Sequence, residues 1–290
     1  MAENAHEFTR YAEVVAAVAD PSLAPVLSAP DVSRIAPVTP GTAAWLRESV
    51  ARFASGPVHE RRRAIVEAEL DRLDPEALRQ ASASATKDAG DSFDARLIAV
   101  QVLAEALSLP GPEDVAHDVA IVAGVYFGGE SGEADAAVAR LQVAAQHDGE
   151  RDLETLANRI GLLVQACDAP AALVNRTREA ASREARAGEY DVDALIAETL
   201  RHDPPVRAIH RVALQATIVA GTAIAAGDRV TLNLVAANRD PAVFERPDEF
   251  DPGRPEPAAA ALTFSSEPRR CPGQQQALAL AAGILTALPD

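Results

Sequence analysis

The chain has 290 residues, of which 48% are hydrophobic and 24% charged, an ordinary globular composition with enough apolar material for a large core. Acidic residues outnumber basic ones by 43 to 27, and the resulting net charge of −16 argues against a protein that binds nucleic acid through its phosphates. The two cysteines, Cys167 and Cys271, cannot form a disulfide framework, so we expect a reducing, cytoplasmic setting.

The sequence carries no signal for export or for a membrane anchor. Its first ten residues lack the basic start and the apolar run of a secretory signal. The longest nearly uncharged stretch, residues 160–174, is too short to span a bilayer and contains Asp168. No internal repeat or low-complexity linker is present, so we expect one domain over residues 1–290.

Residues 42–200 are rich in Ala and Leu at helical spacing. Asp74 followed by Pro75 predicts a helix start, because a capping carboxylate precedes a proline at the first helical position. In the preceding helix, residues 61–73, the expected apolar face consists of Ala64, Ile65, Ala68 and Leu73.

Glycine and proline divide the rest of this helical region. Residues 109–112 and 128–132 predict loops, with a helix restarting near Glu113. A long helix is expected from Asp152 to about Ala187, with Pro170 inside it.

The chain changes character after Pro204. Residues 216–224 and 229–235 alternate with β-branched residues around a turn at 225–228, which predicts two short strands. Residues 240–257 are rich in proline and charge without periodicity, and predict an irregular meander. Residues 274–288 are apolar and helical again. The expected fold is therefore mainly α with a small β portion.

Two features in this second half carry chemistry. Glu198 and Arg201 lie one helical turn apart, which by itself is typical of a surface ion pair. Cys271 lies beside Arg269 and Arg270, just ahead of an apolar helix. Nearby cations and a helix N-terminus both lower a thiol pKa, so a thiolate here would serve as a nucleophile or as a metal ligand. No cluster of Cys, His and Asp for zinc lies near it.

With these features in place, the sequence resembles the cytochrome P450 family of haem-thiolate monooxygenases. The resemblance rests on an ordered series of motifs, which is strongest over the second half of the chain and weaker upstream. The series consists of Glu198 with Arg201, residues 203–206, Arg211, residues 225–230, residues 237–241, Phe244, Pro247, residues 250–252, Arg254, Phe264, Cys271, Gly273 and Ala277.

The resemblance implies haem b as the cofactor and Cys271 as the axial ligand of its iron. It also implies that Glu198 and Arg201 are a structural pair. The cofactor-binding residues that it implies are His59, Arg63, Arg211, Phe264, Arg269, Cys271 and Gly273.

Two of these assignments leave an alternative open. His59 and Arg63 lie four residues apart on one helix face, where cations suit haem carboxylates, but a solvated basic face has the same pattern. Asp168 matches the family's catalytic acid, a proton relay, and is equally well explained as the cap of a helix that restarts at Pro170.

The sequence departs from the family pattern at several positions. Ala169 and Pro170 stand where a hydroxyl residue is usual, and Pro170 is expected to kink its helix. Ser265 and Glu267 replace glycines of the ligand loop. The meander has Glu249 in place of a basic residue, for which Arg246 or Arg254 is expected to compensate.

The fold is expected to be P450-like and reduced at the N-terminus, the substrate-roof region and the C-terminus. Such a reduction leaves an open haem site or a pocket completed by another copy of the chain or by a partner enzyme.

The expected function is a haem-dependent oxidoreductase of the monooxygenase type. It would oxidise a small or medium organic molecule in bacterial specialised metabolism, with electrons from a ferredoxin-type partner or with peroxide. One alternative is a haem enzyme that uses peroxide or performs redox-neutral chemistry without oxygen activation. Another is a non-catalytic partner of a second enzyme. No nucleic-acid or membrane partner is expected.

Overall fold

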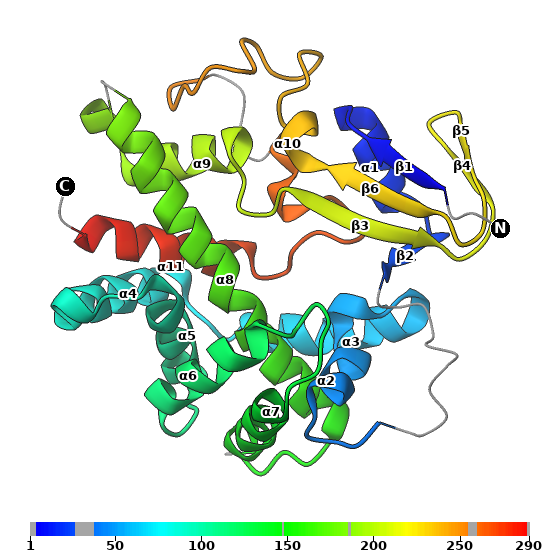
Figure 1. Cartoon of the computed structure of the whole chain (residues 1–290). Coiled ribbons are helices and arrows are strands. Elements are labelled where there is room, and N and C mark those ends of the chain that lie inside the picture. Colours follow the sequence, from blue (N-terminus) through cyan, green and yellow to red (C-terminus); the bar gives the residue numbers. More distant parts are fainter. Residues whose placement is uncertain (1–3, 27–37, 147, 185–186, 255–259, 289–290) are drawn as a thin grey trace. The chain divides into compact units, whose positions relative to one another are not determined.

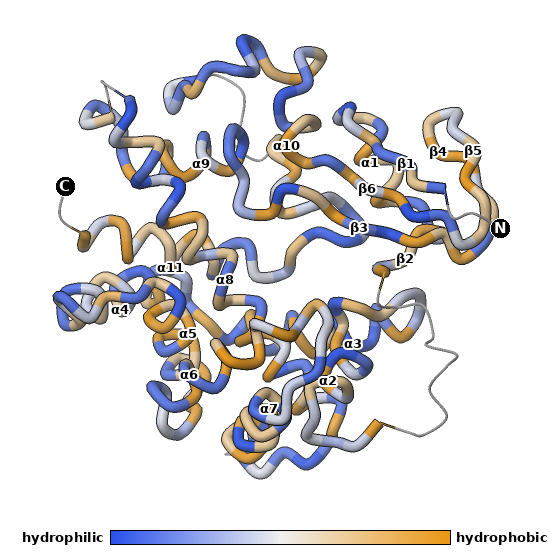
Figure 2. Tube along the Cα trace, viewed as in Figure 1, coloured by the Kyte–Doolittle hydropathy of each residue, from blue (hydrophilic) through white to orange (hydrophobic). Residues whose placement is uncertain are grey.

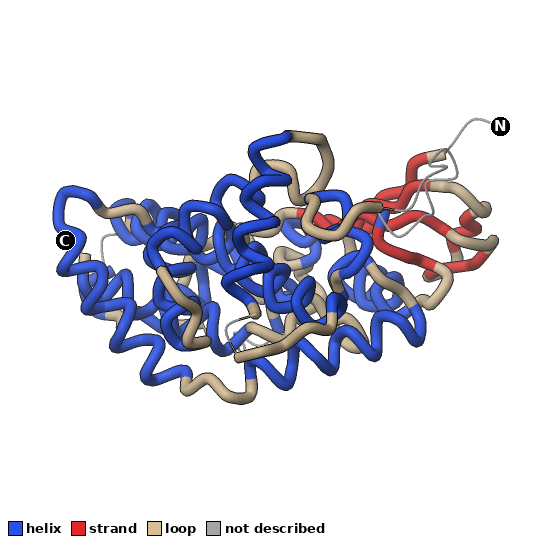
Figure 3. The backbone as a smooth tube through the Cα atoms, turned by 90° about the horizontal axis from the view of Figure 1, so that it is seen from below, coloured by secondary structure: helices blue, strands red, loops and turns tan. Residues whose placement is uncertain are grey.

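The computed structural model describes residues 4–26, 38–146, 148–184, 187–254 and 260–288. The chain divides into two compact units. Unit 1 comprises Met1–Ala29 and Ala172–Cys271, and unit 2 comprises Pro30–Ala171 and Pro272–Asp290. Within the described ranges every strand belongs to unit 1, and unit 2 consists of helices and loops (Figure 3). None of the described helices is both long and apolar enough to cross a membrane.

Unit 2 is a helical assembly in which α11 packs along α4, α5 packs on α6, and α6 packs on α7 (Figure 1). Hydrophobic residues recur along each of these helices (Figure 2). Its elements are α2 (Ala43–Ser49), η2 (Ala51–Phe53), α3 (Gly56–Leu70), α4 (Pro75–Ala89), η3 (Gly90–Ser92), α5 (Ala95–Ala106), α6 (Pro112–Ala123), α7 (Gly132–Ala145), the first part of α8 (Leu153–Arg183) and α11 (Gln274–Ala287).

Local signals predict the helix boundaries of unit 2 well. The Asp74 side chain accepts a hydrogen bond from the Glu76 amide (3.0 Å), which confirms the predicted start of α4. The expected break before residue 113 is also confirmed, because Gly111 has a φ of 60° and α6 begins at Pro112. The expected long helix is α8, which continues through Pro170.

The predicted apolar face of α3 is only partly correct, since Leu73, just beyond the helix, is buried as expected. Ala64 and Ala68 are exposed, whereas Val66, Glu69 and Leu70 are buried. The reason is a buried ion pair, because Glu69 Oε1 accepts from Arg159 Nε of α8 at 2.8 Å and both side chains are over nine-tenths buried. The helix therefore turns a carboxylate inward, where a basic partner from another helix offsets the cost of burying it.

Unit 1 contains a four-stranded sheet in the order β1-β6-β3-β2. β1 (Ala5–Phe8) runs parallel to β6 (Arg229–Asn233), and β3 (Ala208–Ala213) is antiparallel to both β6 and β2 (Leu23–Pro25). A separate hairpin joins β4 (Thr217–Val219) to β5 (Thr222–Ile224). The helical elements are α1 (Tyr11–Ala19), the second part of α8, η4 (Ala187–Glu189), α9 (Val192–His202), α10 (Leu234–Ala237) and η6 (Leu262–Phe264).

The two predicted strands are only partly correct. Residues 216–224 form the β4–β5 hairpin, with Ala220 and Gly221 at positive φ, instead of one strand. The turn at 225–228 exists, and the Asp228 amide donates to the Ala225 carbonyl (3.1 Å). The strand that follows it, β6, pairs with β1 and β3, neither of which was predicted. Short strands whose partners lie far along the chain leave little periodic signal.

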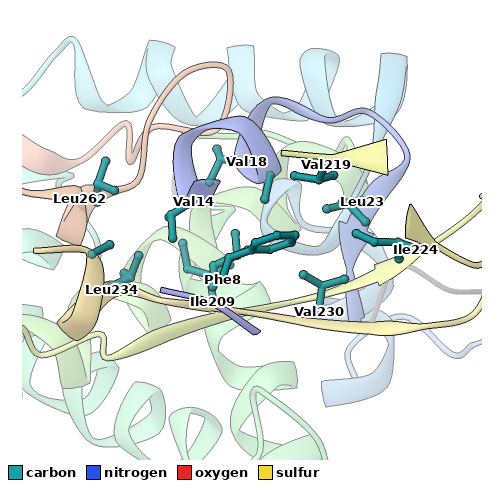
Figure 4. Close-up of a cluster of buried hydrophobic side chains, with 14 residues drawn as sticks. Phe8, Val14, Val18, Leu23, Ile209, Val219, Ile224, Val230, Leu234 and Leu262 are labelled. Atoms are coloured by element: carbon teal, nitrogen blue, oxygen red, sulfur yellow. The ribbon is translucent and has the colours of Figure 1, made fainter. Parts of the chain in front are cut away.

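The core of unit 1 lies between α1 and the sheet. Figure 4 shows side chains from α1, from the strands and from the segment around Leu262 pointing into one cluster. Val14 and Ala17 of α1 are fully buried there, as are Leu232 of β6 and Leu234 of α10. After α10 the chain is irregular from residue 240 to 254, as predicted, and residues 255–257 of the predicted meander lie outside the described residues. The predicted last helix is α11.

Gly283 offers a test of helix packing in unit 2. A Cβ atom added at Gly283 of α11 would overlap with the Arg79 carbonyl and the Ser82 hydroxyl of α4. We expect Gly283→Ala to lower the free energy of unfolding by about 1–3 kcal/mol, the usual cost of overpacking, in urea denaturation. Gly132→Ala is the matched control, because nothing lies within 4 Å of its added Cβ. A Gly283→Ala variant as stable as that control would contradict the packing described.

Candidate functional site

The cysteine loop of unit 1, residues 264–271, presents Cys271 with an exposed side chain that takes part in no disulfide. The Cys271 amide donates to the Phe264 carbonyl (2.8 Å), and within the loop the Arg269 amide donates to the Ser266 carbonyl (2.9 Å). Ser265 has a φ of 62° and a ψ of −168°, a backbone conformation almost confined to glycine, which costs a residue with a Cβ about 1–3 kcal/mol. The turn thus keeps the geometry for which glycine is suited, although a serine occupies the position.

A buried amide fixes the entry to the cysteine loop. The Asn238 side chain is fully buried, and its Oδ1 accepts from the Leu262 amide at 2.7 Å. Its Nδ2 donates to Thr263 Oγ1 (3.1 Å) and to the Leu200 carbonyl (3.3 Å). The Thr263 hydroxyl also donates to the Leu200 carbonyl (2.5 Å). Together these bonds tie η6 to the last turn of α9.

Glu198 and Arg201 form a buried ion pair in that last turn of α9. Arg201 Nη2 lies 2.6 Å from Glu198 Oε1, and each side chain is only 2% exposed. Arg254 adds a second cation, since its Nε donates to Glu198 Oε2 at 2.9 Å. Arg254 therefore compensates for the missing basic residue of the meander, whereas Arg246 pairs with Glu249 and Asp251 at the surface.

The guanidinium of Arg201 also organises the meander backbone. It donates to the carbonyls of Asn238 (3.1 Å), Pro247 (2.7 Å) and Glu249 (2.8 Å). The Phe244 ring covers it, with 5.6 Å between the guanidinium carbon and the ring centroid. A pair that in sequence is typical of a surface is thus satisfied on every side within the core of unit 1.

Unit 1 holds two of the other predicted cofactor-binding cations. Arg211 of β3 is 3% exposed, and its Nη1 donates to the His210 carbonyl at 3.3 Å. Arg269 is half-buried in the cysteine loop, two residues before Cys271. Phe264, also predicted, is the last residue of η6.

The remaining predicted cofactor-binding residues belong to unit 2. His59 is half-buried on α3, and Arg63 lies one turn later with its Nε 2.7 Å from Glu67 Oε1. Gly273 precedes α11, where an added Cβ would meet Leu70 at 3.7 Å, an ordinary contact. Arg211, Phe264, Arg269 and Cys271 thus belong to unit 1, whereas His59, Arg63 and Gly273 belong to unit 2.

Asp168 lies on α8 in unit 2 and forms an ion pair with α5. Its Oδ1 accepts from Arg96 Nε at 2.8 Å, and its side chain is 61% exposed. Because α8 continues through Pro170, the cap that was the alternative for Asp168 is not observed. The neighbouring Cys167 is buried, and burial raises the pKa of its thiol to about 11.

Sequence reasoning missed two polar groups that shape the site. Thr263 and the role of Asn238 have no local signal, because their partners lie on α9, dozens of residues earlier in the chain. In unit 2, Arg159 binds Glu69 and Asp148 at once, and the sequence analysis did not predict this buried cation.

Known proteins resemble this chain in sequence and in fold. Residues 189–288 match the family model described as "Cytochrome P450". Cytochrome P450 144 of Mycobacterium tuberculosis is 43% identical over 74 residues, which are 26% of this chain and 17% of that protein. Erythromycin C-12 hydroxylase of Saccharopolyspora erythraea is 38% identical over 82 residues, 28% of this chain and 21% of that protein. The matched segments are thus only about a fifth of the length of these relatives.

Solved structures extend the likeness of the fold to nearly the whole chain. P450BioI, in complex with an acyl carrier protein that bears hexadec-9Z-enoic acid, has a TM-score of 0.80 at 20% identity, covering 97% of this chain and 83% of that one. CalO2 has a TM-score of 0.77 at 21% identity, covering 98% and 83%. Residues 189–288 therefore resemble the cytochrome P450 family in sequence, and the chain shares the fold of P450BioI over 97% of its length.

Proposed function

We propose that the protein is a haem-thiolate oxidoreductase of the monooxygenase type, with haem b as its cofactor and Cys271 as the axial ligand. The observation that carries the proposal is the presentation of Cys271. Its thiol is exposed, in a turn closed by its own amide and tied to the buried Asn238. A cysteine that served only as a small hydrophobe would be expected in the core, as Cys167 is.

The residues of unit 1 fit such a group. Arg211 is a cation held at 3% exposure in the sheet, and Arg269 lies two residues from the thiol, so both suit the carboxylates of haem. Phe264 and Gly273 stand on either side of the ligand turn in the chain. For His59 and Arg63 the role stays the one that the family resemblance implies.

A thiolate-bound haem supplies an electron-rich iron that favours cleavage of an O–O bond. The chain itself would contribute the iron ligand, the positive charges near that ligand and the residue that relays protons. Arg269 and Arg270 place two positive charges next to Cys271 in the chain. Asp168 is the proposed proton relay, and its carboxylate is shared with Arg96.

A second candidate function has a specific observation in its favour. Ala169 and Pro170 offer no hydroxyl after Asp168, whose carboxylate is turned to Arg96 of α5. This arrangement suits a haem enzyme that uses peroxide or performs redox-neutral chemistry. Turnover with peroxide in the absence of a reductant would indicate peroxide use. Turnover in the absence of both peroxide and reductant would indicate redox-neutral chemistry. Either result distinguishes this function from oxygen activation.

The substrate class and partners are proposed by analogy. One relative is named as the hydroxylase of erythromycin, which suggests a small or medium organic molecule in bacterial specialised metabolism. A ferredoxin-type donor is the proposed source of electrons, and the cytoplasm the proposed location. A second copy of the chain or a partner enzyme is proposed to complete the substrate pocket.

Removal of the proposed ligand tests the assignment. We expect Cys271→Ala to lower the affinity for haem at least about tenfold in a spectrophotometric titration, because the iron loses its protein ligand. Cys167→Ala is the matched control and is expected to bind haem as the unaltered protein does. Equal haem affinity of the two variants would show that Cys271 is not the ligand.

The buried charges predict a separate effect on stability. Glu198→Gln leaves the guanidinium groups of Arg201 and Arg254 without their carboxylate, and we expect a loss of about 3–5 kcal/mol in urea denaturation. The control is Glu249→Gln, since that side chain is 59% exposed and pairs with Arg246 at the surface. Its expected effect is below about 0.5 kcal/mol. Similar losses of unfolding free energy in both variants would contradict the structural role of the Glu198–Arg201 pair.

A further inference from the structure

His202, the last residue of α9, binds the meander next to the backbone carbonyls that Arg201 binds. Its Nε2 lies 3.0 Å from the Asp248 carbonyl. Arg201 donates to the carbonyls of the residues on either side, Pro247 and Glu249. Three successive carbonyls of the meander are therefore bound by two successive side chains at the end of α9.

These contacts define the protonation state of the ring. A carbonyl oxygen only accepts, so Nε2 must carry the hydrogen that it donates to Asp248. The other nitrogen, Nδ1, faces Arg239 Nη2 at 3.4 Å, and a guanidinium only donates, so Nδ1 must present its lone pair. The same Arg239 nitrogen donates to the His202 carbonyl (2.8 Å). The arrangement requires a neutral imidazole.

Packing holds the ring in this orientation. The Phe250 ring meets it edge to face, with the centroids 5.8 Å apart. His202, Arg239, Asp248 and Phe250 all lie in unit 1 and are outside the proposed haem-binding set. The inference therefore stands independently of the proposed function.

We propose that His202 is an acid-released latch, whose neutral ring holds residues 239–250 of the meander against the end of α9. A proton on Nδ1 turns the lone pair that faces Arg239 into a second positive donor. The attraction at that nitrogen then becomes a repulsion, and the meander loses part of its attachment beside the carbonyls that Arg201 binds.

The charges around His202 favour its neutral form in the closed state. Arg201 and Arg239 oppose a positive ring, while Glu198 and the carboxylate of Asp248 favour one. Glu198 already binds two arginines, and Asp248 is 84% exposed with its Oδ1 3.5 Å from Arg239 Nη1. Burial, the largest cause, lowers the pKa of His202 below its usual 6.5; the hydrogen bond to the Asp248 carbonyl raises this pKa, but together with Arg239 and Arg201 the effect of burial prevails.

The lowered pKa of His202 determines the pH range over which the latch is released. When the meander opens, the ring regains its ordinary pKa of 6.5 and binds a proton more readily than in the closed state. The contribution of the latch is therefore complete above pH 6.5. It is lost progressively as the pH falls from 6.5 towards the lower pKa of the closed state.

Hydrogen exchange of the meander amides tests the latch. Protection factors of peptides covering residues 239–250, corrected for intrinsic exchange, are compared between about pH 7.5 and about pH 5.5. We expect them to fall on acidification, by at most about tenfold per pH unit because one proton is involved. In His202→Gln, whose amide can still donate to Asp248 but does not titrate, we expect no such fall.

Two further variants complete the test. His117→Gln alters an exposed histidine of α6 in unit 2, and it should keep the unaltered pH dependence. Arg239→Gln removes the opposing cation and should reduce the dependence even if the His202 variant folds poorly. An equal fall in unaltered protein and in His202→Gln, or no fall in unaltered protein, would overturn the proposal.

Discussion

The burial of one guanidinium, that of Arg201, underlies the organisation of unit 1. A charge at 2% exposure is costly unless every donor finds an acceptor, and here Glu198 and three backbone carbonyls supply them. Those carbonyls belong to the meander, which has no regular secondary structure of its own. The need to satisfy one buried cation thus gives an irregular segment a defined course.

The same interaction reaches the cysteine loop through Asn238. The Asn238 carbonyl accepts from Arg201, while its side chain binds the Leu262 amide and Thr263 at the entry to the loop. The loop closes where the Cys271 amide meets the Phe264 carbonyl. An exposed thiol is therefore positioned by polar groups that are themselves buried. This arrangement suits a ligand that must stay fixed while its sulfur remains accessible.

Local signals in the sequence were enough for the helix starts at Pro75 and Pro112 and for the motif series itself. They were not enough where the partner lies far along the chain. Glu69 is buried because it pairs with Arg159, which lies ninety residues later in the chain. The apolar spacing of α3 therefore did not show which face of the helix is buried. The Glu198–Arg201 spacing was visible, but its burial depends on residues 238–254. The strands β1, β2 and β3 were not predicted because each is short and pairs with a segment far along the chain.

The central claim is that Cys271 is presented as a thiolate ligand for haem. The most direct measurement is the absorption spectrum of the haem-loaded protein after reduction and addition of carbon monoxide. We predict a Soret band at the long wavelength characteristic of a thiolate-bound haem. A Soret band at the conventional wavelength, or folded protein that binds no haem, would contradict it.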